Sequence, residues 1–219
     1  MASRPKRATP RPAPRLYLIT PQIADASAFS AQVISALEAG DVAAVLLRLG
    51  DGHERALING AKSLAGAVQS KECALLIDGR FDLVARSGAD GAHLTGVAAL
   101  TEALDQLKPD RITGVGGLAS RHDAMVVAER GADYVMFGEP DAAGKRPSLS
   151  AIEERVRWCA EVFEIPSVGY AASLDEIAPL SLAGADFVAL GEFVWRDEAA
   201  IASVIAEAGR TLRLPEPAA

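Results

Sequence analysis

The chain has 219 residues, of which 50% are hydrophobic, and its formal net charge is −7. This length suits a single domain with a sizeable core, and the acidic balance argues against sequence-independent nucleic-acid binding, which depends on neutralising phosphates. No apolar run approaches the ~18 residues that a membrane-spanning helix requires. The expected partners therefore include neither nucleic acid nor a membrane.

The two cysteines, Cys73 and Cys159, lie inside apolar runs. A disulfide framework usually has more cysteines in a shorter chain, so we interpret both as buried thiols in a reducing compartment and expect a cytoplasmic protein. Residues 1–14 combine four basic residues with four prolines and no apolar segment, which predicts a disordered basic arm rather than a secretory signal. Residues 211–219 are predicted to form a frayed tail.

Between these ends, in residues 15–210, eight short apolar runs alternate with eight helical patterns. Most of the runs are continuously apolar, which is typical of strands that are buried on both faces of a parallel sheet. We predict strands at residues 16–20, 42–48, 73–77, 91–94, 112–115, 134–137, 167–170 and 187–190.

The intervening segments have the helical period. Phe29, Val33 and Leu37 recur every four residues before Gly40, and comparable apolar faces follow the second and sixth strands. Ser150 and Ser173 each precede a glutamate by three residues, which is the spacing of a helix-starting capping box.

One internal repeat indicates the architecture. Gly-Ala-Asp followed by an apolar strand begins at Gly88, Gly131 and Gly184, and each glycine can adopt the left-handed conformation that ends a helix. Repeated strand–helix units predict an α/β protein with one (β/α)8 TIM barrel. An open doubly wound sheet is the alternative, although no Gly-x-Gly-x-x-Gly opens its first helix.

In such a barrel the active site lies at the carboxyl ends of the strands. That rule gathers one set of residues around the mouth: Thr20, Arg48, Asp78, Arg80, His93, Gly116, Gly138, Glu139, Lys145, Tyr170, Ser173, Gly191 and Glu192.

The candidates for ligand binding each have a structural alternative. Arg48 suits bidentate binding of a phosphate or carboxylate, or it pairs with Asp78 or Glu139. Asp78 suits a metal or hydroxyl ligand, or it forms an Asp-Gly turn. His93 lies within a strand, where a histidine is more often part of the core.

Three further candidates come from the later strands. Lys145 belongs to a long loop, residues 138–147, which acts either as a lid over an anion or as a solvated loop. Ser173 begins a helix in a region where barrels often bind phosphate, or it caps that helix. Gly191 is followed by Glu192, whose carboxylate would repel a phosphate.

These segments resemble thiamine phosphate synthase from about Arg15 to Trp195. The resemblance rests on Leu-Tyr-Leu-Ile-Thr at residues 16–20, Ile-Asp-Gly-Arg-Phe-Asp-Leu at 77–83, Gly-Ala-Asp-Gly-Ala-His-Leu at 88–94 and Gly-Ala-Asp-Tyr at 131–134. The thiazole tautomerases, a sister group on the same barrel, are about as similar, and they share the glycine before Arg80.

The resemblance implies a reaction that joins an aminopyrimidine diphosphate to a thiazole phosphate and releases diphosphate, with magnesium and basic side chains on the leaving group. It also implies a small phosphorylated ligand, Arg48 and Lys145 as matching basic residues, and Asp78, which stands where the family has an asparagine, as the one candidate for a metal contact.

Several positions depart from that pattern. Residues 49–50 are Leu-Gly after the retained Arg48, Gly79 replaces an aspartate, Ala98 stands near the second expected carboxylate, and Gly116 replaces a serine. Further departures are Asp141–Gly144 for a threonine-rich loop, Ala171–Ala172 for Gly-Gly, Gly191 for a serine, and Leu118 or Ala119 for the tautomerase histidine.

Because these losses weaken the electrostatic stabilisation of a leaving diphosphate, we expect weak or lost family activity. A barrel that binds a thiamine precursor or a protein partner without catalysis, and a different enzyme acting on a phosphorylated ligand, are the competing hypotheses.

Overall fold

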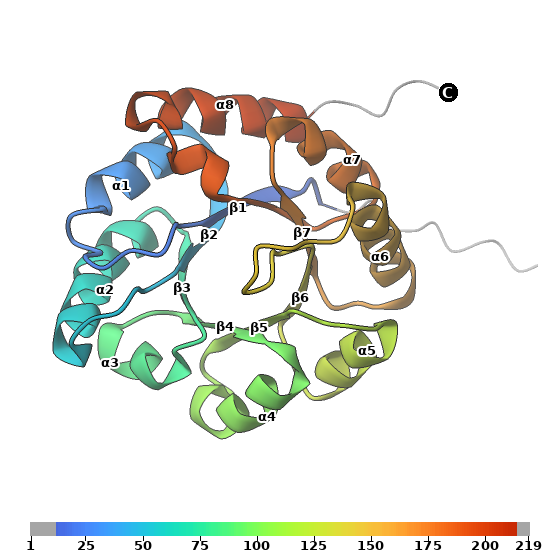
Figure 1. Ribbon diagram of the computed structural model, residues 1–219, viewed down its shortest axis with the longest axis horizontal. Helices are drawn as coiled ribbons and strands as arrows, with labels where there is room; N and C mark the ends of the chain where they lie inside the picture. The colour runs from blue at the N-terminus through green and yellow to red at the C-terminus, as the bar shows by residue number, and fades with distance from the viewer. Residues whose placement is uncertain (1–11, 214–219) are drawn as a thin grey trace, which may run out of the picture.

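The computed structural model describes residues 12–213, and it is a closed barrel of eight parallel strands (Figure 1). Each strand pairs with the next one in the chain, and the last pairs with the first. The predicted (β/α)8 barrel is therefore confirmed, and the open-sheet alternative is wrong. The strands are β1 (Arg15–Ile19), β2 (Val42–Leu47), β3 (Ala74–Asp78), β4 (Gly91–Thr95), β5 (Ile112–Gly116), β6 (Tyr134–Phe137), β7 (Ser167–Ala171) and β8 (Phe187–Leu190).

Helices ring the outside of the barrel (Figure 1). Four short 3₁₀ segments lie among them: η1 (Phe81–Leu83), η2 (Leu174–Glu176), η3 (Glu192–Trp195) and η4 (Glu198–Ala200). The α-helices are α1 (Ser30–Ala39), α2 (Glu54–Gln69), α3 (Val84–Ser87), α4 (Gly96–Leu107), α5 (Arg121–Glu129), α6 (Leu149–Val162), α7 (Ile177–Leu182) and α8 (Ile201–Leu212).

The strands carry apolar residues on both faces because the barrel has two apolar layers. Alternate strand residues point inward, and the inner layer includes Tyr17, Leu46, Leu76 and Tyr134. The residues between them pack outward against the helices. This double burial explains the continuous apolar runs, and each predicted strand end lies within one residue of the observed end.

The three Gly-Ala-Asp repeats turn the chain from a helix into β4, β6 and β8. Gly88, Gly131 and Gly184 have φ angles of 75°, 92° and 95°, a region that residues with a Cβ seldom adopt. The predicted left-handed conformation is confirmed at all three positions.

The aspartate of each repeat binds the first part of the preceding strand. Its backbone N–H donates to the carbonyl of one residue there, and its carboxylate accepts from the backbone N–H of that same residue. The three carboxylate bonds are Asp90 to Leu75 at 2.8 Å, Asp133 to Thr113 at 2.7 Å and Asp186 to Ser167 at 2.8 Å. The repeat therefore joins β3 to β4, β5 to β6 and β7 to β8 at the amino end of the barrel.

The two predicted capping boxes are wrong. Ser148, and not Ser150, caps α6 by accepting from the backbone N–H of Ala151. Ser173 precedes η2 without a side-chain capping bond, since the backbone N–H of Glu176 donates to the Ser173 carbonyl instead. The Glu176 carboxylate binds Arg146 and the backbone N–H of Ala172.

The proposed division of the chain is only partly covered by the structure. The predicted arm at residues 1–14 and the tail at 211–219 lie mostly outside the described residues, and α8 continues to Leu212, so it extends past residue 210. Within residues 12–213, no helix is long and apolar enough to cross a membrane.

Candidate active site

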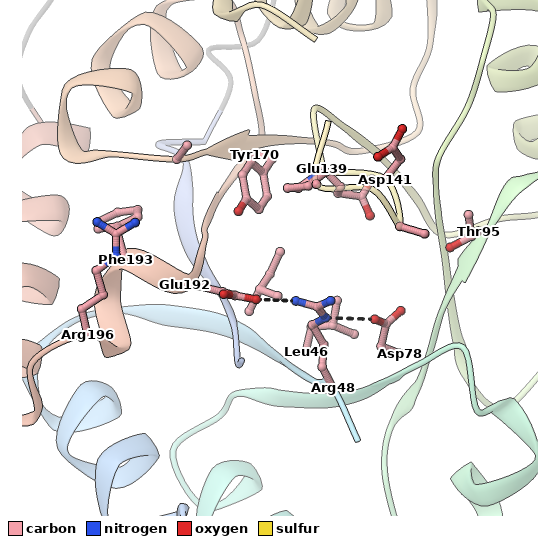
Figure 2. A pocket seen from close by; sticks show the side chains of 15 residues that line it. Leu46, Arg48, Asp78, Thr95, Glu139, Asp141, Tyr170, Glu192, Phe193 and Arg196 are labelled. Atoms are coloured by element: carbon pink, nitrogen blue, oxygen red, sulfur yellow. Dashed lines mark hydrogen bonds and ion pairs between the residues drawn. The ribbon is translucent and has the colours of Figure 1, made fainter. Parts of the chain in front are cut away.

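A cavity of about 490 Å³ opens at the carboxyl ends of the strands (Figure 2). Its volume lies in the range of small-molecule sites. Both arginines and acidic residues line it, from β2, β3, the end of β6 and the segment after β8. The charged lining residues are Arg48, Asp78, Glu139, Asp141, Glu192 and Arg196.

Arg48 lies between two carboxylates (Figure 2). Its Nη1 donates to Glu192 at 2.8 Å, and its Nε lies 3.4 Å from Asp78. Its backbone N–H donates to the Thr20 hydroxyl at 3.0 Å, which fixes the end of β2. Of the two ion pairs that the sequence allowed for Arg48, the one with Asp78 is present, while Glu192 takes the place expected for Glu139.

Asp78 follows Leu76 on the inward face of β3. Burial raises the pKa of its carboxyl, and the nearby charges of His93 and Arg48 oppose that rise. In residues 12–213 no three His, Cys, Asp or Glu side chains gather to hold a metal ion. With its carboxylate already beside Arg48, Asp78 does not form a magnesium site from the side chains described, and no reaction step is assigned to a metal.

His93 connects the cavity to the interior of the barrel. Its Nε2 lies 2.7 Å from Oε1 of Glu139, which lines the cavity, and its Nδ1 lies 2.9 Å from the Tyr134 hydroxyl. The Tyr134 hydroxyl lies 2.9 Å from that of Tyr17. His93 is therefore buried and hydrogen-bonded, as a core histidine would be, but one of its partners faces the mouth.

The charges around His93 oppose its burial. Burial alone lowers the pKa of His93, but the charge of Glu139, the hydrogen bond to it and the charge of Asp78 together raise the pKa above its ordinary value. Burial also raises the pKa values of Tyr17 and Tyr134. Both hydroxyls consequently remain protonated and available as hydrogen-bond donors.

The loop between β6 and α6 reaches over the barrel centre (Figure 1). Asp141 folds it, accepting at its Oδ1 from the backbone N–H groups of Ala143 and Lys145, each at 2.9 Å. Arg146 pairs with Glu176 at 2.9 Å and lies over the Tyr170 ring, 5.4 Å from its centroid. These contacts hold both halves of the loop, and Pro140, Asp141, Ala142 and Gly144 form one wall of the cavity.

Of the remaining predicted site residues, three lie outside the cavity lining. Arg80 pairs with Asp82 beside η1, and neither it nor the exposed Lys145 is among the residues that line the cavity. Ser173 likewise lies outside the lining. Gly191 leaves room for Tyr170, because a Cβ at this position would lie 2.2 Å from the Tyr170 hydroxyl.

Several lining residues were absent from the predicted mouth, among them Asp141, Phe193 and Arg196. These three lie one to five residues beyond positions that the strand ends had indicated, where short loops and the 3₁₀ turn η3 fold back over the mouth.

Comparison with known proteins identifies the family. A family model described as thiamine monophosphate synthase matches residues 16–194. The chain belongs to this family. A thiamine-phosphate synthase of Rhodospirillum centenum is 42% identical over 202 residues, which cover 91% of this chain and 98% of that protein. One from Hyphomonas neptunium is 37% identical and covers 87% and 90% of the two chains. The structure of a thiamine phosphate pyrophosphorylase from Pyrococcus furiosus has the same fold, with a TM-score of 0.72 at 21% identity over 90% of this chain and 95% of that one.

The positions that the resemblance marked as departures have defined places in the structure. A Cβ on Gly116 would lie 2.1 Å from Glu139, so the glycine provides the space that this carboxylate fills. Gly79 has a φ of 67° with open space beside it. Ala98 lies on α4, outside the cavity lining.

Proposed function

We propose that this barrel binds the small phosphorylated precursors of thiamine phosphate in the mouth around Arg48, and joins them far more slowly than a typical thiamine-phosphate synthase. The match to the family over residues 16–194 supports the ligand class. The two ion pairs that Arg48 already makes with carboxylates support the low rate.

A diphosphate must compete for Arg48 with two carboxylates that are already in place, Asp78 and Glu192. The cavity lining carries two arginines, Arg48 and Arg196, against four acidic side chains. Catalysis of diphosphate departure requires fixed positive charge where negative charge develops. A lining with more acidic than basic groups supplies little of it.

Arg196 is the second cation of the cavity lining, and with Arg48 it forms what we call the phosphate side of the mouth. Within the described residues its guanidinium has no ion pair, in contrast to Arg48. A monophosphate needs fewer contacts than a diphosphate, and Arg196 with one face of Arg48 suits that smaller charge. We therefore expect the thiazole phosphate to bind more readily than the aminopyrimidine diphosphate.

A steady-state assay with both precursors and Mg²⁺, beside an active thiamine-phosphate synthase, tests the rate. We expect turnover at least about a hundredfold below that enzyme. Turnover within about tenfold, a barrier difference of ~1.4 kcal/mol, contradicts the proposed low rate. Thermal melting with each precursor tests binding directly, since a ligand that binds only the folded chain raises its melting temperature.

Glu192→Gln tests the reason given for the low rate. It removes one of the two carboxylates that occupy Arg48, and we expect it to tighten binding of inorganic diphosphate several-fold. Glu198→Gln, which removes the same charge from η4 outside the cavity lining, is the matched control. Equal effects of the two changes contradict competition for Arg48.

A further inference from the structure

The inward face of β5 has no side chains at two alternate positions. A Cβ on Gly114 would lie 1.9 Å from the Tyr134 ring, and one on Gly116 would lie 2.1 Å from the Glu139 carboxylate. Tyr134 begins β6, the strand beside β5, and Glu139 lies two residues after β6 ends. The glycines therefore provide room for a phenol from the neighbouring strand and a carboxylate from the loop after it.

These two groups belong to one hydrogen-bonded row. It runs from Tyr17 through Tyr134 and His93 to Glu139, with successive distances of 2.9, 2.9 and 2.7 Å. The first three side chains are buried, with relative exposures of 2%, 6% and 1%. Glu139 alone reaches the cavity, where 19% of its side chain is exposed.

The row has a defined direction when His93 is neutral. A carboxylate only accepts hydrogen bonds, so Nε2 of His93 carries the proton that it donates to Glu139. Its Nδ1 then accepts from the Tyr134 hydroxyl, which accepts in turn from Tyr17. Every polar group of the row is satisfied, and the row holds the Glu139 carboxylate in one orientation.

Glu139 differs from the other carboxylates of the cavity. Asp78 and Glu192 pair with Arg48, and Asp141 accepts from backbone N–H groups of its own loop. Within residues 12–213, no lysine or arginine pairs with Glu139, whose partners are His93 and, at 3.4 Å, the backbone N–H of Gly117. Its remaining acceptor capacity faces the cavity.

We propose that Glu139 binds the N–H edge of a nitrogen heterocycle with an amino group next to a ring nitrogen, and that His93 is its positioning residue. The aminopyrimidine of the proposed function has such an edge, so the inference rests on that function. It places the aminopyrimidine ring on the β4–β6 side of the mouth. The phosphate side, at Arg48 and Arg196, lies across the cavity (Figure 2).

Binding of two probes to Glu139→Gln tests the assignment without turnover. Gln keeps an acceptor for His93 but loses the charge. We expect aminopyrimidine diphosphate, in the absence of thiazole phosphate, to bind about tenfold or more weakly, the loss typical of a hydrogen bond to a charged group. Inorganic diphosphate, which has no heterocycle, should bind no more weakly than to the wild type.

Glu198→Gln is the matched control, since it removes the same charge from η4, outside the cavity lining. We expect its affinity for the aminopyrimidine diphosphate to stay within about twofold of the wild type. If Glu139→Gln also binds that probe as the wild type does, the inference is overturned while the proposed function stands. If neither probe binds the wild type, the proposed function fails and the inference with it.

Gly116→Ala provides a second test that keeps the carboxylate. The added Cβ displaces Glu139 from its place beside β5, so we expect the same selective loss of the aminopyrimidine probe. This variant decides the matter if Glu139→Gln does not fold, as judged by its thermal melting. Unchanged binding to a folded Gly116→Ala overturns the inference.

His93→Gln tests the positioning role through its pH profile. The titratable groups that face His93 are Glu139 and Tyr134 from the β6 region, Asp78 from β3 and, through Tyr134, Tyr17 from β1. Protonated His93 offsets the charge of Glu139, so wild-type affinity for aminopyrimidine diphosphate should fall relative to that of His93→Gln as the pH decreases. A ratio of the two affinities that does not change with pH overturns the positioning role.

Discussion

At the amino end of the barrel, three aspartates make the same contact three times, whereas the acidic side chains at the mouth have partners of three different kinds: an arginine, a histidine and backbone N–H groups. Asp90, Asp133 and Asp186 each bind the backbone of the preceding strand. At the mouth, Glu192 pairs with an arginine and Glu139 with a histidine.

The difference separates what the fold requires from what a ligand requires. The same helix-to-strand turn occurs at each of the three repeats, so the same aspartate contact stabilises all three. A binding mouth must present unlike groups to the unlike parts of one ligand. The changes below test whether the two ends do carry these separate roles.

The largest effect on stability is expected from Tyr134→Phe. The change keeps the ring but leaves the Tyr17 hydroxyl and Nδ1 of His93 without their partner inside the barrel. Because a buried polar group without a partner costs ~1–3 kcal/mol, we expect the free energy of unfolding to fall by about 2–3 kcal/mol. Denaturant unfolding measures it. Tyr170→Phe is the control, since no described side chain hydrogen-bonds to that hydroxyl, and an equal loss in both variants contradicts the assigned role of the row.

Asp186→Ala should have the next largest effect. It removes the acceptor of the Ser167 backbone N–H at the start of β7, and we expect a loss of about 1.5 kcal/mol in the free energy of unfolding. Ligand affinity at the opposite end should be unchanged. Asp105→Ala, on the exposed face of α4, is the matched control. If Asp186→Ala changes the free energy of diphosphate binding as much as it changes the free energy of unfolding, the separation of roles between the two ends is contradicted.

The sequence predicted the amino end far better than the mouth. The strands and the three repeats are local features, since each depends on a run of apolar residues or on a glycine ahead of an aspartate. The contacts of the mouth join distant positions: Glu192 lies 144 residues from Arg48, and His93 lies 46 residues from Glu139. No local pattern specifies such pairs.

One signal for the mouth was present in the sequence. Gly114 and Gly116 alternate on the inward face of β5, and empty positions inside a barrel require large side chains from a neighbouring strand to fill them. Tyr134 and Glu139 are those side chains. The alternation identifies the neighbours that must fill the space, although not the histidine that completes the row.

A smaller effect on the free energy of unfolding is expected from the protonation of His93 as the pH changes. The pKa of His93 is raised in the folded chain, so its protonated form stabilises the fold fully below its unfolded value of about 6.5. That contribution is lost as the pH rises through the raised folded pKa. Glu139→Gln removes the main cause of the rise. The difference in unfolding free energy between wild type and variant should therefore be largest below about pH 6.5 and should shrink at higher pH. Denaturant unfolding across pH 5.5–9 measures this difference, and one that grows with pH contradicts the assignment.

The smallest effect is expected from Arg80→Ala, compared with the same change at Arg48. Arg80 pairs with Asp82 on the surface, where the two side chains are 42% and 47% exposed. Exposed pairs of this kind contribute ~0–1 kcal/mol to stability.

Since Arg80 is not among the residues that line the cavity, its loss should change diphosphate affinity less than about twofold. Arg48→Ala removes a guanidinium from the lining itself, and a lost charged contact of ~1.5 kcal/mol corresponds to about tenfold weaker binding. Calorimetric titration of both variants with inorganic diphosphate measures the two dissociation constants. Equal losses would place Arg80 with the ligand, as the strand ends alone had predicted, and would mean that the loop after β3 moves toward the mouth when the ligand binds.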